Sequence, residues 1–291
     1  SPWVLTEPVI RAYAASIGDD NPLYSDQEYA KNGPYGCLVA PGTALIMARN
    51  AMWHGARRVG GWPIANFHSG TAWEFFDVLR VGTGFKTSST GKEVIEKPGA
   101  QGNLFFFITD VFYWDMRGDL LGKCYGTLIM VPREEMGTGR AMSVERLGER
   151  MMYERNVPKY NAEKVEETLD LIEKAKPRGK KILYWEDVKE GETLPTFVVP
   201  PWTDQDWNST ASIRNGPPMF GYNFEAGYQM RRHIQHEGFG NDNGIPYTHP
   251  ISRWLWSAAD EHGDALMAAY RGQALPFGGV VQRSQIPQAL M

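Results

Sequence analysis

The sequence predicts an α+β fold in which an antiparallel sheet wraps around a buried helix, with two copies of this unit in the chain. Three observations predict it. Apolar residues at helical spacing come first, segments rich in aromatic and β-branched residues follow up to residue 132, and a short pattern of the first unit recurs near residue 280. One buried helix followed by several long antiparallel strands is typical of a sheet that covers a helix.

Three helices are expected before the strands. Thr6 is a candidate N-cap for a first helix that Gly18 ends, and a short second helix covers Gln27 to Lys31. A third, more apolar helix follows Ala40-Pro41-Gly42 and should be the buried one. Its apolar side chains at helical spacing are Leu45, Ala48 and Met52.

Four strands are expected between residues 68 and 132, because aromatic and β-branched residues dominate there. Turn residues such as Arg117-Gly118-Asp119 separate them, so neighbouring strands should run antiparallel. The expected strands are Ala72 to Val81, Phe85 to Thr90, Leu104 to Trp114 and Leu120 to Val131.

These patterns divide the chain into a first unit over residues 1–132, a charged helical connector over 133–181, and a second unit over 182–291. In the connector, Asn161 is a candidate N-cap for an amphipathic helix. The second unit is expected to open with one or two strands between Ile182 and Val199, with Gly191 at a turn.

A weak internal repeat relates the two units. Tyr35 to Val39 and Phe277 to Val281 both combine an aromatic residue, a glycine turn and a short apolar run before a helix. On this alignment about 80 residues that hold the first unit's long strands have no counterpart in the second. We therefore expect the second unit to be incomplete here, with its strands supplied by a longer chain or by another polypeptide.

Composition and charge narrow the classes of function. The 34 acidic residues outnumber the 30 basic ones, which argues against a dedicated nucleic-acid binder. The sequence contains no run of about 18 apolar residues, so it predicts no membrane-spanning helix. Two cysteines and no visible signal peptide fit a reducing cytosol. We expect a cytoplasmic protein with neither a nucleic-acid nor a membrane partner.

The loop after the first helix carries a pattern that resembles a known family. Residues 17–26 read Ile-Gly-Asp-Asp-Asn-Pro-Leu-Tyr-Ser-Asp, and residues 39–43 read Val-Ala-Pro-Gly-Thr. They resemble the MaoC-like hydratase/dehydratases, and more closely their fatty-acid-synthase-type N-terminal dehydratase domain. Further similar segments are Trp73 to Phe76, Val78 to Gly82, Glu93 to Lys97 and Tyr184 to Val188. The resemblance implies a hot-dog fold, often as two fused copies, and hydration or dehydration of acyl thioesters such as enoyl-CoA.

The family's catalytic motif, an Asp followed five residues later by a His, is incomplete in this chain. Asp19 and Asn21 are present, but Tyr24 stands at the His position. His exchanges protons near neutral pH, whereas Tyr has an ordinary pKa of about 10. We take Asp19 as a catalytic candidate and Asn21 and Tyr24 as substrate-binding candidates. An ordinary turn before a proline is the alternative interpretation of Asp19 and Asn21.

The second unit offers His249, which precedes Pro250 and an apolar stripe at helical spacing, so it should lie at the start of a helix. No Asp stands five residues before it, because that position is Gly244. Asp242 is the nearest carboxylate upstream. We take His249 and Asp242 as further catalytic candidates, with a plain helix cap as the other interpretation of His249.

Together these features predict a hydratase/dehydratase, a carbon-oxygen lyase that acts on a 2,3-enoyl or 3-hydroxyacyl thioester of the CoA type. A His-carboxylate pair would act on water, while backbone N–H groups near Gly42 and Thr43 polarise the thioester carbonyl. No metal or other cofactor is expected. Two alternatives stay open: a non-catalytic acyl-binding subunit beside a catalytic hot-dog partner, and a hot-dog thioesterase. The expected assembly is a hetero-oligomer with a second hot-dog subunit, or a homo-oligomer.

Overall fold

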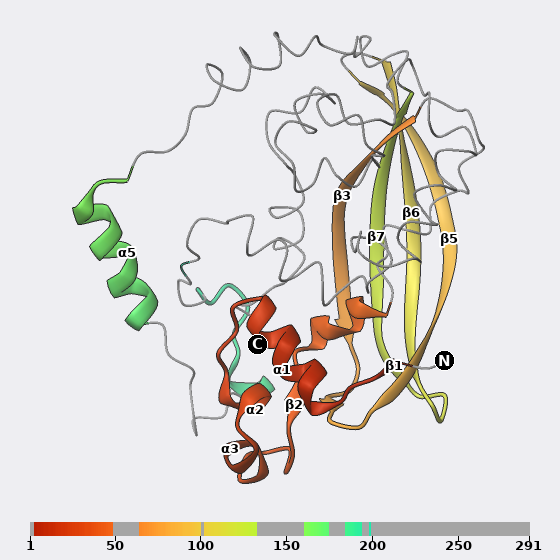
Figure 1. Cartoon of the computed structure of the whole chain (residues 1–291). Coiled ribbons are helices and arrows are strands. Elements are labelled where there is room, and N and C mark those ends of the chain that lie inside the picture. The colour runs from red at the N-terminus through yellow and green to blue at the C-terminus, as the bar shows by residue number, and fades with distance from the viewer. Residues whose placement is uncertain are drawn as a thin grey trace, which may run out of the picture.

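A five-stranded antiparallel sheet dominates the computed structural model (Figure 1). The structure describes residues 3–48, 64–99, 102–132, 160–174, 184–193 and 198. The strands lie in the order β1-β5-β6-β7-β3. Their bounds are β1 Trp3–Val4, β3 Ile64–Phe75, β5 Gly84–Gly99, β6 Gly102–Asp115 and β7 Leu120–Pro132.

Several short elements gather beside one end of this sheet (Figure 1). A two-stranded ladder joins β2, Val39–Ala40, to β4, Leu79–Arg80. The helical elements are α1 Glu7–Ser16, α2 Pro22–Ser25, α3 Gln27–Lys31 and the 3-10 helix η1 Gly42–Met47.

The first and third of these helices form where the sequence predicts them. α1 follows Thr6, whose carbonyl accepts a hydrogen bond from Ile10 N–H at 3.0 Å. The Thr6 side chain makes no capping bond among the described residues, so Thr6 marks the boundary without capping it. Gly18 has a φ of 69°, a left-handed conformation that glycine adopts without strain, and it turns the chain after α1. α3 has the predicted bounds.

The predicted buried helix is present in part, and its type differs from the expectation. Thr43 to Met47 are all buried, but Gly42–Met47 is a 3-10 helix rather than an α-helix. Its ends are closed by three-residue bonds, from Ala44 N–H to the Pro41 carbonyl and from Ala48 N–H to the Leu45 carbonyl. Such bonds give donors a partner within a short, tightly wound segment. Met52 lies outside the described residues.

Two strand predictions were close and two need correction. β6 and β7 lie within two residues of the expected bounds. The expected strand from Ala72 to Val81 is wrong, because β3 ends at Phe75 and the chain bends before β4; the Asp77 carboxylate accepts the Val78 N–H at 2.7 Å in this bend. β5 continues past Thr90 to Gly99, since residues 93–99 pair with β6 beyond a bulge after Gly91.

The turn between β6 and β7 confirms the predicted Arg117-Gly118-Asp119 turn. The Asp115 carboxylate accepts the N–H groups of all three turn residues, each at 2.8 Å, and Gly118 has a φ of 100°. The bond from Asp119 N–H and the pairing with the Arg117 side chain lower the pKa of Asp115. One carboxylate therefore satisfies the backbone donors of the whole turn.

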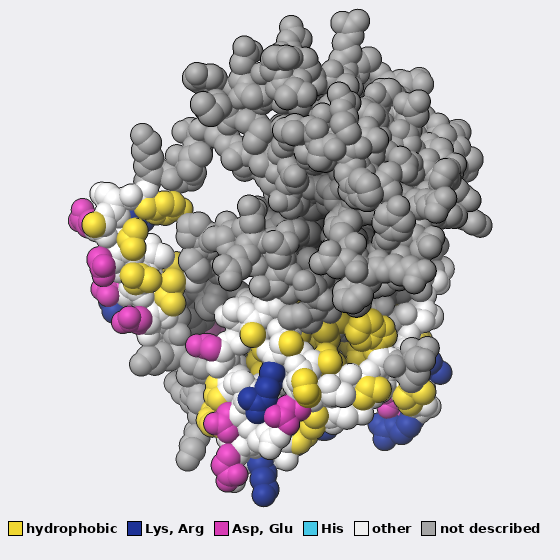
Figure 2. All heavy atoms as spheres, viewed as in Figure 1, with side chains coloured by type: hydrophobic (Ala, Val, Ile, Leu, Met, Phe, Trp, Pro, Cys, Tyr) yellow, Lys and Arg dark blue, Asp and Glu magenta, His cyan; other side chains and the backbone are white. Residues whose placement is uncertain are grey.

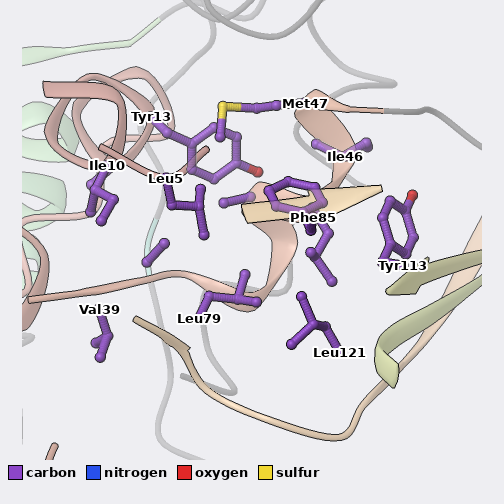
Figure 3. Packing of buried hydrophobic residues seen from close by; sticks show 14 of the residues in the cluster. Leu5, Ile10, Tyr13, Val39, Ile46, Met47, Leu79, Phe85, Tyr113 and Leu121 are labelled. Carbon is purple, nitrogen blue, oxygen red and sulfur yellow. The ribbon is translucent and has the colours of Figure 1, made fainter. Parts of the chain in front are cut away.

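The hydrophobic core lies between the short elements and the inner face of the sheet. Side chains from α1, η1 and the strands meet in one buried cluster (Figure 3). Members from the helical side include Leu5, Ile10, Tyr13, Leu45, Ile46 and Met47, and members from the strands include Leu79, Phe85, Val111, Tyr113 and Cys124. This packing confirms a sheet that covers a buried helix, the predicted α+β class.

The rest of the chain is described in two further segments. α5, Ala162–Lys174, begins after Asn161, whose side-chain oxygen accepts Lys164 N–H at 2.8 Å and confirms the predicted cap. The described residues between 184 and 198 hold a 3-10 turn, Trp185–Asp187, rather than a strand, because Asp187 N–H bonds back to the Tyr184 carbonyl. The predicted turn at Gly191 is confirmed by its φ of 81°. In the described part of the chain, no helix is long and apolar enough to cross a membrane.

The remainder of the predicted second unit lies outside the described residues. This covers the repeat at Phe277 to Val281, the candidates Asp242 and His249, and the expected absence of late strands. The division into units at 132 and 181 therefore stays a prediction.

A glycine in β7 gives a stability test of the contact between the sheet and η1. A Cβ at Gly122 would lie 2.7 Å from Leu45 Cδ1 and 3.3 Å from the Glu74 carbonyl oxygen. Because Leu45 is fully buried, Gly122→Ala should lower the free energy of unfolding by about 1–3 kcal/mol, the usual cost of overpacking. Urea unfolding measures the change. Gly91→Ala is the control, since its Cβ would meet nothing within 4 Å; equal stability of the two variants would contradict the close contact.

Candidate functional site

The loop between α1 and α2 holds three of the candidate residues in a tight turn. The Asp19 side-chain oxygen accepts Asn21 N–H at 3.1 Å, and the Asn21 side-chain oxygen accepts Leu23 N–H at 3.1 Å. Pro22 follows at the first helical position of α2, where its missing N–H costs nothing. Asn21 is thus the N-cap of α2, and this structural task fixes the loop.

Burial and charge raise the pKa of Asp19. Its carboxyl is half-buried, and desolvation raises the pKa because it disfavours the ionised form. The Asn21 N–H bond lowers the pKa in part, and the negative charge of Asp20 raises it. The net shift is upward, which makes the Asp19 carboxylate a stronger base than an ordinary aspartate.

The same effects act on Tyr24 with the opposite consequence for chemistry. Its side chain is 5% exposed, and burial and then the charge of Asp19 raise the pKa of its phenol. A phenol with a raised pKa stays protonated at neutral pH, so Tyr24 can donate a hydrogen bond but cannot serve as a base there. Tyr24 belongs to the same core cluster as Val39 and Ala44.

The start of η1 holds the two remaining candidates of the first unit. Ala44 is the first residue of η1 whose N–H bonds back to a preceding carbonyl, so the N–H groups of Gly42 and Thr43 have no partner within the helix. Thr43 is completely buried, and within the described part of the chain its Oγ1 has no hydrogen-bond partner. These donors could stabilise negative charge on a carbonyl oxygen.

The structure brings some of the candidates together and leaves others unplaced. Tyr24 and the residues after Thr43 share one core cluster, so the loop of Asp19 lies on the same side of the sheet as η1 (Figure 1). Asp242 and His249 lie outside the described residues. In the described segments no group of three His, Cys, Asp or Glu side chains could hold a metal ion.

Sequence reasoning missed an aromatic residue beside η1. A Cβ at Gly42 would lie 2.9 Å from two carbons of the Phe75 ring, so this ring rests on the Gly42 backbone. The signal was available in the alternation along β3, since Trp73 and Phe75 are two residues apart and must share one face of the sheet.

Comparisons with known proteins point to dehydratases. Residues 2–122 match the family model described as FAS1-like, dehydratase domain region. No curated protein matches the chain.

Solved structures with a related fold are similar over part of the chain. A MaoC-like dehydratase from Rhodospirillum rubrum is 20% identical over 46% of this chain and 88% of its own, with a TM-score of 0.36. The ChsH1-ChsH2 complex from Mycobacterium tuberculosis is 16% identical over 45% of this chain and 83% of that chain, with a TM-score of 0.38. The R-hydratase PhaJ1 from Pseudomonas aeruginosa is 21% identical over 45% and 77%, with a TM-score of 0.32.

A pH titration of stability tests the electrostatics of Asp19. Asp19→Asn keeps an oxygen that can accept Asn21 N–H but removes the charge. Because the pKa of Asp19 is raised in the folded state, the ionised carboxylate disfavours folding. The protonated carboxyl contributes its full stabilisation below the unfolded pKa of about 3.9, and this contribution is lost as pH rises through the folded pKa.

The free energy of unfolding of wild type should therefore fall relative to that of Asp19→Asn as pH rises from about 3.5 to about 7. Urea unfolding of both proteins across this range measures the difference. A difference that does not change with pH, or that grows in favour of wild type, would contradict the raised pKa.

Proposed function

Because residues 2–122 match the family model described as FAS1-like, dehydratase domain region, we propose that this protein adds water to a 2,3-enoyl thioester of the CoA type, or removes it from a 3-hydroxyacyl thioester. The observation that carries the proposal is the position of Asp19. A half-buried carboxyl with a raised pKa stands at the Asp position of the family's motif, on the same side of the sheet as η1. A carboxylate of this kind suits general base catalysis.

The reaction needs two proton transfers and a site for transient negative charge. In hydration a base takes a proton from water as the water oxygen bonds to C3, and an acid delivers a proton to C2. Between these steps charge develops on the thioester oxygen, where the N–H groups of Gly42 and Thr43 would stabilise it. Asp19 would act as the base in the first unit, and Tyr24 and Asn21 would line the substrate site.

The proton for C2 requires a group that titrates near neutral pH. Tyr24 does not meet this requirement, because burial raises its pKa. We assign this role to His249, with Asp242 as the carboxylate that orients it. No metal or other cofactor takes part in this scheme.

Tyr24 also favours a second candidate function, a non-catalytic acyl-binding subunit. A buried phenol at the position of the motif's His retains binding and loses proton transfer. In that case a hot-dog partner would supply a complete Asp-His motif. The substrate site would still lie along η1.

We propose that the protein works as an oligomer with a second hot-dog subunit or a second copy of itself. β3 lies at the end of the described sheet and pairs with β7 alone among the described strands. A twelve-residue strand with one unpaired edge is normally covered. Both cysteines are free, which fits the reducing cytoplasm that we propose as its location.

Incubation with a panel of enoyl-CoA thioesters tests the proposed activity. Hydration should remove the absorbance of the conjugated thioester without releasing free CoA thiol, whereas a thioesterase would release the thiol. The assay uses the full chain, alone and with any protein that co-purifies. No loss of absorbance with any chain length in either preparation would refute the hydratase activity.

Two substitutions separate proton transfer from binding. His249→Ala should lower kcat by about 10²-fold or more, the usual size of a general acid-base contribution. Tyr24→Phe should change KM and leave kcat nearly unchanged, because the Tyr24 phenol stays protonated. Steady-state kinetics on one enoyl-CoA measures both. Wild-type kcat in His249→Ala would move the chemistry to the partner subunit.

A further inference from the structure

Three aromatic rings form a row on the inner face of the sheet. Phe75 and Trp73 stack with their centroids 5.7 Å apart and their planes at 8°, and Trp73 stacks on Tyr113 at 5.6 Å and 26°. Tyr113 projects from β6 into the core and is fully buried (Figure 3). Phe75, at the other end of the row, is 42% exposed. The row thus leads from the core to the surface.

The exposed ring of this row has a fixed position over the start of η1. Gly42 lies against its carbons Cδ1 and Cε1, and Gly122 of β7 lies beside the same ring, since a Cβ there would be 3.8 Å from Cδ1. The ring cannot withdraw toward Trp73, because Trp73 is itself stacked on buried Tyr113. Trp73, Gly42 and Gly122 therefore fix the position of the Phe75 ring, while the rest of the ring is exposed.

The surroundings of this ring suit an apolar ligand with a polar end. Hydrophobic side chains gather around η1 and the adjoining end of the sheet on the face shown in Figure 2. Thr43 Oγ1 and Trp73 Nε1 are buried, and in the described part of the chain neither has a hydrogen-bond partner. A buried donor without a partner is costly, so such groups mark places where a ligand could bond.

We propose that Phe75 determines substrate specificity by limiting the space beside C2 of the acyl group, so that unbranched acyl thioesters bind in preference to 2-methyl-branched ones. This inference rests on the proposed function. With the thioester oxygen on the donors of Gly42 and Thr43, C2 is the acyl atom bonded to the carbonyl carbon. The proposal places C2 on the side of the ring that covers Gly42, where a methyl group on C2 competes with this ring for space.

Binding of two unreactive thioesters tests the proposal without relying on turnover. Isothermal titration of the protein, with any co-purifying partner, compares butyryl-CoA with 2-methylbutyryl-CoA. Wild type should bind butyryl-CoA about tenfold more tightly or better, the usual effect of one methyl group at a hydrophobic site. Phe75→Ala should reduce this ratio about tenfold by binding the branched thioester more tightly.

Phe76→Ala is the matched control. Phe76 follows directly and is 52% exposed, and its N–H continues the strand pairing by bonding to the Leu121 carbonyl at 3.0 Å. Consecutive side chains of an extended chain point to opposite faces, so this variant should keep the wild-type ratio. If circular dichroism shows that Phe75→Ala does not fold, Phe75→Leu takes its place, because leucine keeps most of the apolar volume. Phe75→Leu should also lower the affinity ratio.

The outcomes separate this inference from the proposed function. If wild type binds butyryl-CoA and the Phe75 variant that folds keeps the wild-type ratio, the role of Phe75 is refuted while thioester recognition stands. An equal change in Phe76→Ala would also refute it, because the effect would then not be specific to the covering ring. If wild type binds neither thioester, both the inference and thioester recognition are refuted.

Discussion

The close approach of η1 to the inner face of the sheet is the contact on which the rest of the site depends. Two glycines permit it. Gly122 of β7 leaves room for Leu45 of η1, and Gly42 leaves room for the ring of Phe75 from β3. A Cβ at either position would overlap a neighbour that is packed from behind, so the helix and the sheet could not keep their present distance. The N–H groups at the start of η1 are thereby held beside the ring of Phe75.

Desolvation acts on two neighbouring groups of the loop and gives them different chemistry. It raises the pKa of the Asp19 carboxyl and of the Tyr24 phenol alike, because both are charged only when deprotonated. The pKa of the Asp19 carboxyl moves toward neutral pH, which makes the carboxylate a stronger base. The pKa of the Tyr24 phenol moves away from neutral pH, so the phenol stays protonated and can donate a hydrogen bond. The loop therefore keeps one titrating group where the family's motif has two.

The sequence predicted best those elements that are fixed by hydrogen bonds between neighbouring residues. Such bonds can be expected from the residue types alone. They form the turn at Asp115, the cap at Asn161 and the start of α3. The far half of β5 gives a weak strand signal, because charged residues and a proline surround Val94 and Ile95 there, and this half is a strand through its pairing with β6. Pairing partners are set by the fold and not by local preference.

Only part of the candidate site could be predicted from the sequence. Asp19 and Asn21 could be identified from their motif, and the turn that they form depends on hydrogen bonds between adjacent residues. The sequence did not predict the 3-10 geometry of η1 or the position of Phe75 on Gly42, since both depend on contacts of η1 with β3 and β7, which are distant in sequence. The strand pattern placed Trp73 and Phe75 on one face, but only packing shows which helix residue that face meets.

The tyrosine in the motif has a consequence for how catalysis could be assembled. Desolvation raises the pKa of half-buried Asp19, and the negative charge of Asp20 raises it further. Within the described residues Asp19 has no cationic partner. An imidazole brought beside it by the second unit or by another subunit would gain a proton and lower the pKa of Asp19 again, because each charge stabilises the other. The energetic cost of burying Asp19 would then be offset only in the assembled site. Under the proposed function, Tyr24 would thus leave the acid-base pair to be completed across an interface, and assembly would be a condition for activity.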